Sequence, residues 1–184
     1  MEILRIVVTG TVGAGKTSLI RSISEIDVVD TDRRATDETA QMKRDTTVAF
    51  DFGRLTIGPD QVLHLYGTPG QARFDFMWDI LIRKAHAYML LVAANRPQDF
   101  RYGRRIMNFM NQRVEIPMII GLTHVDCPDA WEPENVALAL GLIHPSQRPP
   151  MVMINATEAP SVANGLVVLI EKLMQQLPVA VGCR

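Results

Sequence analysis

A glycine-rich segment near the start of the sequence has the residue types and spacing of a phosphate-binding loop. The segment GTVGAGKT, residues 10–17, matches G-x-x-x-x-G-K-[ST] and lies between an apolar β-branched run and a predicted helix. Its glycines let the backbone curl so that N–H groups point at phosphate oxygens, and the helix adds the positive end of its dipole. We expect Lys16 to reach the β- and γ-phosphates of a nucleoside triphosphate and the Thr17 hydroxyl to bind Mg²⁺. The alternative is a glycine-rich turn with an exposed lysine. The residues predicted to contact the nucleotide here are Gly10, Val12, Gly13, Ala14, Gly15, Lys16, Thr17 and Ser18.

Alternating strands and helices must position this loop. Short, uninterrupted apolar runs are typical of parallel strands that are covered on both faces. Residues 46–66 hold two alternating runs around the sequence GPD, which predicts a hairpin. The apolar strands are expected at 3–10, 87–94, 116–123 and 151–156, and the helices at 16–26, 98–112, 133–142 and 162–177. This order predicts a three-layer α/β domain with a mostly parallel six-stranded sheet and one antiparallel edge strand, which binds ligands at the carboxyl ends of its strands.

Length and composition indicate one globular domain, residues 1–184. Of the 184 residues 47% are hydrophobic and the formal net charge is -1, which gives no reason to expect nucleic-acid binding. The two cysteines, Cys127 and Cys183, have no metal-ligand spacing, so we expect a reduced, cytoplasmic protein. No apolar run approaches the roughly 18 residues of a membrane span. Because Glu2 and the position of Cys183 exclude N-myristoylation and prenylation, we expect no intrinsic membrane anchor.

Five short motifs, in one order along the chain, resemble those of the Ras-like small GTPases. After the phosphate loop come Thr47 in TTVAFDF, where the family has its first-switch threonine, and GTPGQ (67–71), where it has D-x-x-G-Q. THVD (123–126) stands in place of N-K-x-D, and NAT (155–157) in place of S-A-K. The T-x-x-x-F spacing in the first switch is similar to that of the Arf branch, and the DFG and PGQ runs resemble those of bacterial MglA-like and Roadblock-associated small GTPases.

This resemblance implies a P-loop NTPase fold of the Ras-like type and the function of a cytoplasmic molecular switch. Such a protein binds GTP and GDP with Mg²⁺ and hydrolyses GTP slowly. It signals through its switch segments to regulatory or effector proteins, and the resemblance implies Roadblock-type partners here. Two other functions stay open. One is a P-loop ATPase or phosphotransferase, and the other is a guanine-nucleotide-binding interaction module with negligible hydrolysis.

The resemblance assigns roles to residues of both switch segments. Thr47 would bind Mg²⁺ and sense the γ-phosphate, although one threonine in a β-rich run can be purely structural. Gly70 would donate its N–H to the γ-phosphate and Gln71 would orient the attacking water, so Lys16, Gly70 and Gln71 form the predicted catalytic set. Taken alone, a glutamine after Pro-Gly is more often a surface turn residue. The aromatic-rich segment 73–80 either anchors the second-switch helix or binds a partner.

The resemblance also places the guanine base beside the last two motifs. Asp126 can accept hydrogen bonds from the guanine N1–H and amino group, which adenine cannot offer; the alternative is an exposed loop aspartate. Thr123 and His124 replace the asparagine and lysine of the family, which loosens the predicted base site. Ala156 would offer its backbone N–H to the guanine oxygen. The predicted base-side residues are Thr123, His124, Asp126, Asn155, Ala156 and Thr157.

One expected carboxylate is missing from the second switch. Gly67 stands where the family has an aspartate that holds a water on Mg²⁺, so the ion would depend on Thr17, Thr47 and the nucleotide. Asp51 is the first candidate to replace that aspartate. The cations that could assist hydrolysis, each more often a solvated surface residue, are Arg33, Arg34, Lys43, Arg44 and Arg73.

Overall fold

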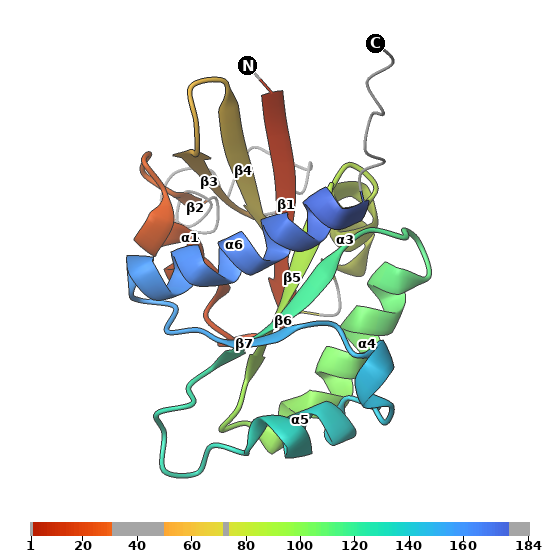
Figure 1. Cartoon of the computed structure of the whole chain (residues 1–184). Coiled ribbons are helices and arrows are strands. Elements are labelled where there is room, and N and C mark those ends of the chain that lie inside the picture. Colours follow the sequence, from red (N-terminus) through yellow and green to blue (C-terminus); the bar gives the residue numbers. More distant parts are fainter. Residues whose placement is uncertain (1, 31–49, 72–73, 177–184) are drawn as a thin grey trace, which may run out of the picture.

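A computed structural model describes residues 2–30, 50–71 and 74–176, which fold around a single sheet (Figure 1). The strand order is β2-β3-β4-β1-β5-β6-β7. Strands β4, β1, β5, β6 and β7 run parallel, β3 pairs antiparallel with β4, and β2 pairs antiparallel with β3. The strands are β1 (Glu2–Gly10), β2 (Val29–Asp30), β3 (Asp51–Thr56), β4 (Gln61–Gly67), β5 (Ala87–Ala93), β6 (Met118–Thr123) and β7 (Met151–Met153).

Helices cover both faces of this sheet. Helices α1 and α6 pack on one face, and α3, α4 and α5 pack on the other. Figure 1 shows α6 crossing the front of the sheet beside α1. The helices are α1 (Lys16–Ile23), α3 (Asp75–Ile82), α4 (Phe100–Asn111), α5 (Pro133–Ala139) and α6 (Ala159–Gln176), with short 3₁₀ turns η2 (Pro97–Asp99) and η3 (Pro145–Gln147).

The predicted fold class is confirmed: the sheet is mostly parallel, with one antiparallel strand, and helices flank it. The predicted hairpin is formed by β3 and β4. The two-residue strand β2, which we did not predict, pairs outside β3 and therefore takes the edge position. None of the described helices is long and apolar enough to cross a membrane.

Helix α1 is three residues shorter than expected, and its end has a local cause. At Ser24 the backbone turns to an extended conformation, with φ -72° and ψ 134°. The Ser24 hydroxyl accepts a hydrogen bond from the Ile26 N–H and donates one to the Ile26 carbonyl. Since the Glu25 N–H donates to the Arg54 carbonyl of β3 at 2.8 Å, the chain leaves the helix to follow the sheet.

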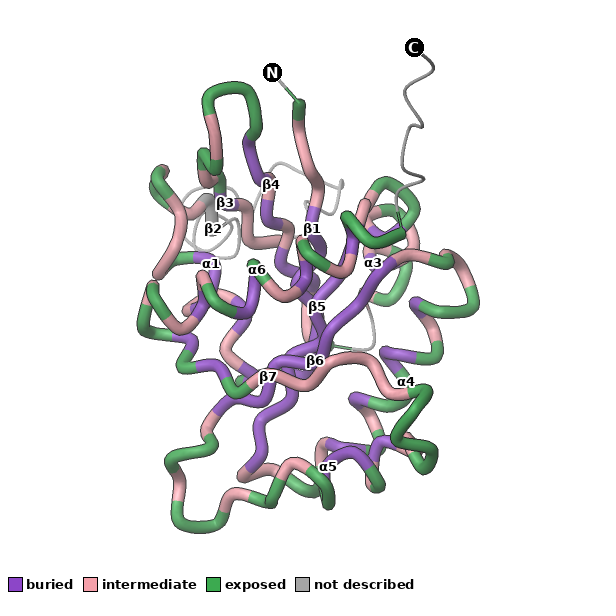
Figure 2. Tube along the Cα trace, viewed as in Figure 1, coloured by how far each residue is buried: buried purple, intermediate pink, exposed green. Residues whose placement is uncertain are grey.

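Burial increases toward the end of the sheet where the site lies. Every residue of β5 is buried, and β1 changes from exposed at Glu2 to buried along its last five residues, as Figure 2 shows. Gly10 of β1 pairs with Leu91 of β5, and Ala93 of β5 pairs with Thr123 of β6. The carboxyl ends of these three strands thus form one packed edge, on which the loops with the predicted site residues are held.

Candidate nucleotide-binding site

The phosphate loop joins the end of β1 to the first residue of α1. Gly13 and Gly15 have φ values of +75° and +98°, a backbone region that side-chain-bearing residues rarely adopt. A Cβ atom on Gly10 would lie 2.4 Å from the Leu91 carbonyl oxygen, so the loop needs glycine there to leave β1 beside β5. The predicted loop is therefore present, with its backbone curled at the N-terminus of α1. Ser18 follows in the first turn of that helix and is half-buried.

Lys16 lies inside the loop and is not an exposed lysine. Its side chain is 8% exposed, and its Nζ donates hydrogen bonds to the carbonyls of Gly10 at 2.9 Å and Thr11 at 2.7 Å. Burial lowers the pKa of Lys16 to about 8, an effect that the nearby Asp51 carboxylate partly offsets. The ammonium group is therefore still mostly protonated at neutral pH, at a position where a phosphate could replace the carbonyls as its partner.

A carboxylate of the neighbouring strand lies beside position 67. Asp51 and Gly67 are directly paired across β3 and β4, and the Thr17 hydroxyl donates to Asp51 Oδ2 at 2.6 Å. A Cβ atom on Gly67 would lie 3.0 Å from Asp51 Oδ2 and 2.9 Å from Ile20 Cδ1. A side chain at 67 would therefore crowd both Asp51 and Ile20, and glycine leaves room for them.

The second-switch segment lies against the phosphate loop at Gly70. A Cβ atom on Gly70 would be 2.7 Å from the Val12 backbone nitrogen and 3.0 Å from Lys16 Nζ. Gln71 follows with an exposed side chain, and its carbonyl accepts a hydrogen bond from the Phe74 N–H at 3.1 Å. The segment thus holds Gly70 against Val12 and Lys16 and leaves the Gln71 side chain at the surface. Thr47 and the five candidate cations Arg33, Arg34, Lys43, Arg44 and Arg73 lie outside the described residues.

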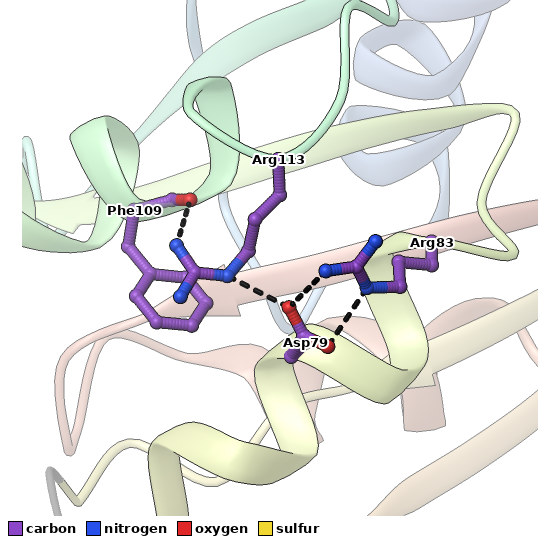
Figure 3. Close-up of polar contacts among 4 residues, drawn as sticks. All are labelled: Asp79, Arg83, Phe109 and Arg113. Atoms are coloured by element: carbon purple, nitrogen blue, oxygen red, sulfur yellow. Dashed lines mark hydrogen bonds and ion pairs between the residues drawn. The ribbon is translucent and has the colours of Figure 1, made fainter.

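The helix after the second switch is anchored at two points. Trp78 is 2% exposed, and its indole N–H donates to the Pro69 carbonyl at 2.8 Å. Asp79 accepts hydrogen bonds from Arg83 of its own helix and from Arg113 beyond α4, and the Arg113 guanidinium lies 3.3 Å from the Phe109 ring centroid (Figure 3). These bonds, the one from Arg83 first, hold the pKa of Asp79 below its usual value.

The aromatic-rich segment divides between the two predicted roles. Trp78 faces the core and anchors the helix, which is the first of the two roles expected for this segment. Phe76 and Ile80, in contrast, are 48% and 51% exposed. The helix turns one apolar side to the sheet and leaves these two side chains outside.

The base-side motifs meet the phosphate loop at its other end. The Thr123 hydroxyl is buried and donates to the Ala14 carbonyl at 2.9 Å, although 109 residues separate the two. Ala156 packs on the loop as well, because a Cβ atom on Gly15 would lie 3.1 Å from the Ala156 Cβ. Thr123 therefore fixes the base-side loop to the phosphate loop, a role that its sequence position alone does not reveal.

The remaining base-side residues lie in two turns around this junction. His124 has a φ of +56°, and its Nδ1 is 3.0 Å from the Thr123 hydroxyl. Asp126 follows with an exposed side chain. Asn155 and Thr157 are exposed, and the Asn155 side-chain oxygen accepts hydrogen bonds from both the N–H and the hydroxyl of Thr157. The chain thus turns at His124 directly after the buried Thr123, and Asp126 follows two residues later at the surface.

One residue beside the loop was not predicted from the sequence. Arg96 follows β5, and its Nη1 donates to the Val12 carbonyl at 3.2 Å. The signal that could have found it is its position just after an apolar strand, at the edge where ligands bind in α/β sheets. Its contact with residue 12 depends on β5 lying beside β1, which the sequence does not state.

The fold and this site define a P-loop domain with the architecture of the small GTPases. The chain is similar to a solved structure of the Arl6 (BBS3) small GTPase from Trypanosoma brucei with the bound nucleotide analogue GppNp. The TM-score is 0.70 at 16% sequence identity, over 95% of this chain and 99% of that one, so the similarity shows the fold.

The sequence comparison gives the family. Residues 26–176 match the family described as "Conserved hypothetical ATP binding protein", and the chain belongs to that family. The match begins after the phosphate loop, which is identified by its own pattern and geometry. The chain is also 31% identical over 94 residues to the uncharacterized protein MJ1339 of Methanocaldococcus jannaschii, and that stretch covers 50% of this chain and 53% of the relative.

Proposed function

We propose that this protein is a molecular switch that binds GTP and GDP with Mg²⁺ and hydrolyses GTP slowly. The observation that carries the proposal is the convergence of three loops on one phosphate loop. Gly70 lies at its Val12 side, while Thr123 and Ala156 lie at its Ala14–Gly15 side. A nucleotide whose phosphates follow the loop from one side to the other would have its γ-phosphate near Gly70 and its base near Thr123.

The residues beside Lys16 fit Mg²⁺. Thr17 and Asp51 present a hydroxyl and a carboxylate oxygen 2.6 Å apart, and oxygen donors of this kind are the ones that Mg²⁺ prefers alongside phosphates. When bound, the ion would supply positive charge that offsets the charge developing on the phosphates during hydrolysis. We expect Thr17 to bind it directly, Asp51 to hold a water of its shell, and Thr47 to join in the GTP form.

Asp126 supports guanine as the base. Its carboxylate is exposed next to the junction of the base-side loop and the phosphate loop, where it can accept two hydrogen bonds from guanine. The family description names ATP, and ATP binding is therefore the second candidate function. Adenine offers a carboxylate no matching pair of donors, so the two candidates make opposite predictions for nucleotide preference.

For hydrolysis, the proposed roles follow the positions around the loop. Lys16 neutralises charge on the β- and γ-phosphates, and the Gly70 N–H would stabilise the γ-phosphate oxygens. Gln71 would turn inward to orient the attacking water. Because the Gln71 side chain is exposed, it must be ordered before it can act, which accords with a slow intrinsic rate.

The nucleotide bound after purification, followed by a single-turnover assay, tests this proposal. We expect guanine nucleotides to be released on denaturation and bound GTP to be hydrolysed once per site in the presence of Mg²⁺. Adenine nucleotides in the same assay would favour the ATPase, and bound GTP that persists would favour an interaction module without hydrolysis.

A groove next to the second-switch helix supports a partner at this surface. It has a volume of about 610 Å³ and lies between α3 and strands β1 and β4. Its apolar lining includes Tyr66, Met77, Ile80 and Leu81, and the cations Arg5 and Lys84 also line it. We propose that it takes an apolar segment of a regulatory or effector protein with acidic flanks. We also propose that, among the small GTPases, this protein is most similar to the MglA-like and Roadblock-associated ones. The partner would then be a Roadblock-type protein.

A pull-down in the two nucleotide states tests the partner proposal. The variant is Ile80→Ala, and the matched control is Val167→Ala on α6, because both side chains are 51% exposed. We expect a partner that binds the form loaded with a non-hydrolysable GTP analogue, is lost with Ile80→Ala and is kept with Val167→Ala. Identical partners in the GTP-analogue and GDP forms would contradict the switch function.

A further inference from the structure

Arg96 is held in a fixed position at the edge of the sheet. Its backbone N–H donates to the Ala93 carbonyl at 3.0 Å, and its carbonyl accepts from the Asp99 N–H at 3.0 Å. Two residues earlier, the Ala94 N–H donates to the Thr123 carbonyl at the end of β6 at 2.8 Å. The turn after β5 is therefore tied to its own strand and to the neighbouring strand β6.

The Arg96 guanidinium lies along the backbone of the phosphate loop. Besides the bond from Nη1 to the Val12 carbonyl, a Cβ atom on Gly13 would lie 2.4 Å from Nη1, 3.0 Å from Cζ and 3.1 Å from Nη2. Both terminal nitrogens and the central carbon thus lie where a side chain on Gly13 would be. The absence of a side chain at Gly13 leaves the space that this guanidinium fills.

The position along the loop indicates which part of a nucleotide would lie nearby. Gly70 contacts the loop at Val12 N and Lys16 Nζ, and Thr123 contacts it at the Ala14 carbonyl. Arg96 touches the loop between these two sides. A guanidinium between the γ-phosphate side and the base side would lie next to the α- and β-phosphates, which GDP and GTP share.

The charge of Arg96 is available for such a ligand. None of the ion pairs formed between described residues includes it. A guanidinium has five N–H donors, and the hydrogen bond to the Val12 carbonyl uses one of them. Arginine next to phosphate typically forms strong, charge-assisted hydrogen bonds.

We propose that Arg96 is a built-in phosphate clamp that strengthens binding of nucleoside di- and triphosphates equally. The proposal rests on the proposed nucleotide-binding function, but not on the identity of the base. Because the clamp acts on phosphates common to substrate and product, it contributes to affinity and leaves the rate of hydrolysis unchanged.

The test compares Arg96→Gln and Arg96→Lys with a matched control, Arg101→Gln, which removes an exposed arginine on α4. Dissociation constants are measured for GDP, ADP and a non-hydrolysable GTP analogue by displacement of a fluorescent nucleotide, and hydrolysis of bound GTP is followed in a single turnover. For Arg96→Gln we expect the dissociation constants of GDP and of the GTP analogue to rise by the same factor, about tenfold. Arg96→Lys should recover part of the loss, because it restores the charge. Arg101→Gln should bind like the wild type.

Two results would overturn the clamp. One is GDP and GTP-analogue affinities for Arg96→Gln within twofold of the wild type. The other is a loss of hydrolysis rate with unchanged affinity, which would make Arg96 a transition-state cation. A structural role predicts instead a lower melting temperature of nucleotide-free Arg96→Gln than of nucleotide-free Arg101→Gln, and no recovery by lysine. If the assignment of guanine fails, the wild type will bind ADP more tightly than GDP. Arg96→Gln should then still weaken ADP binding, and this weakening is the result that tests the clamp.

Discussion

On the phosphate side of the site, the charged groups of Lys16 and Asp51 are bonded to their neighbours, whereas on the base side the charged group Asp126 is exposed. Lys16 is buried against two carbonyls, and Thr17 donates to Asp51. On the base side the buried group is Thr123, a neutral hydroxyl that bonds to the phosphate loop. On the phosphate side the charged groups are therefore already held by hydrogen bonds. On the base side the hydrogen bond of Thr123 holds only the backbone in place.

The two sides differ in how residues that depart from the motifs of the resembled family are accommodated. Strand β4 has no aspartate at Gly67, but the paired position of β3 carries Asp51, which accepts a hydrogen bond from Thr17. Thr123 and His124 stand where the resembled family has asparagine and lysine; the Thr123 hydroxyl bonds to the phosphate loop, and the His124 ring contacts Thr123. We therefore expect variants on the phosphate side to have the larger effects.

The largest effect is expected for Lys16→Ala. Removing this buried ammonium should weaken triphosphate binding by more than about 100-fold, because charge-assisted bonds to two phosphates are lost. The fold should persist, since alanine leaves no unpaired charge in the loop. Calorimetric titration with a GTP analogue measures the loss, and Lys172→Ala on α6 is the control. Binding that survives in Lys16→Ala would mean that the phosphates lie elsewhere.

Asp51→Asn should come next. Loss of a carboxylate in the second shell of a metal typically costs about 10- to 100-fold in metal affinity. Mg²⁺ titrated against release of mant-GDP should show this shift, while Asp60→Asn in the β3–β4 turn should show none.

The strand pairing allows a sharper version of the same experiment. Gly67→Asp alone should destabilise the fold, because its Cβ would meet Asp51. The double variant Asp51→Gly with Gly67→Asp should recover Mg²⁺ affinity by moving the carboxylate back across the pair. Equal Mg²⁺ requirements for the wild type and Asp51→Asn would remove Asp51 from the metal site.

A smaller effect, on rate alone, is expected for Gln71→Leu. Hydrolysis in a single turnover should slow about tenfold, because the attacking water loses its orienting amide, and nucleotide affinity should stay close to the wild-type value. Gln112→Leu, an exposed glutamine at the end of α4, serves as the control. A wild-type rate in Gln71→Leu would shift the hydrolytic role to another residue.

The smallest effect is expected on the base side, for Thr123→Val. Valine keeps the shape but removes the bond to Ala14, which should lower the free energy of unfolding by about 1 kcal/mol and weaken GDP binding severalfold. Thr56→Val, whose hydroxyl bonds to exposed Glu25, should change neither. If Thr123→Val reduced affinity more than Asp51→Asn, the contrast between the two sides would be reversed.

The sequence predicted the elements whose determinants are local. The phosphate loop needs glycines and a lysine at fixed spacings, and the buried strands need only continuous apolar runs. The pairing of Asp51 with Gly67 could be inferred as well. The two residues lie equally far on either side of Pro59, which is in the predicted hairpin turn.

Contacts that depend on strand order were not predictable in the same way. The bond from Thr123 to Ala14 requires β6 to be held near β1 by β5, and the contact from Arg96 to Val12 requires β5 to lie beside β1. The burial of Trp78 depends on which side of α3 faces the sheet, and an apolar segment with aromatics on every side does not specify that side.

The most direct test of the account is a competition of GTP and ATP against mant-GDP in the presence of Mg²⁺, for the wild type and for Asp126→Asn. The account predicts that GTP displaces mant-GDP from the wild type at a concentration about 100-fold lower than ATP, because only guanine pairs with the carboxylate. It also predicts that Asp126→Asn prefers xanthine nucleotides. Equal displacement of mant-GDP by ATP and GTP, unchanged in Asp126→Asn, would contradict the assignment of guanine to this site.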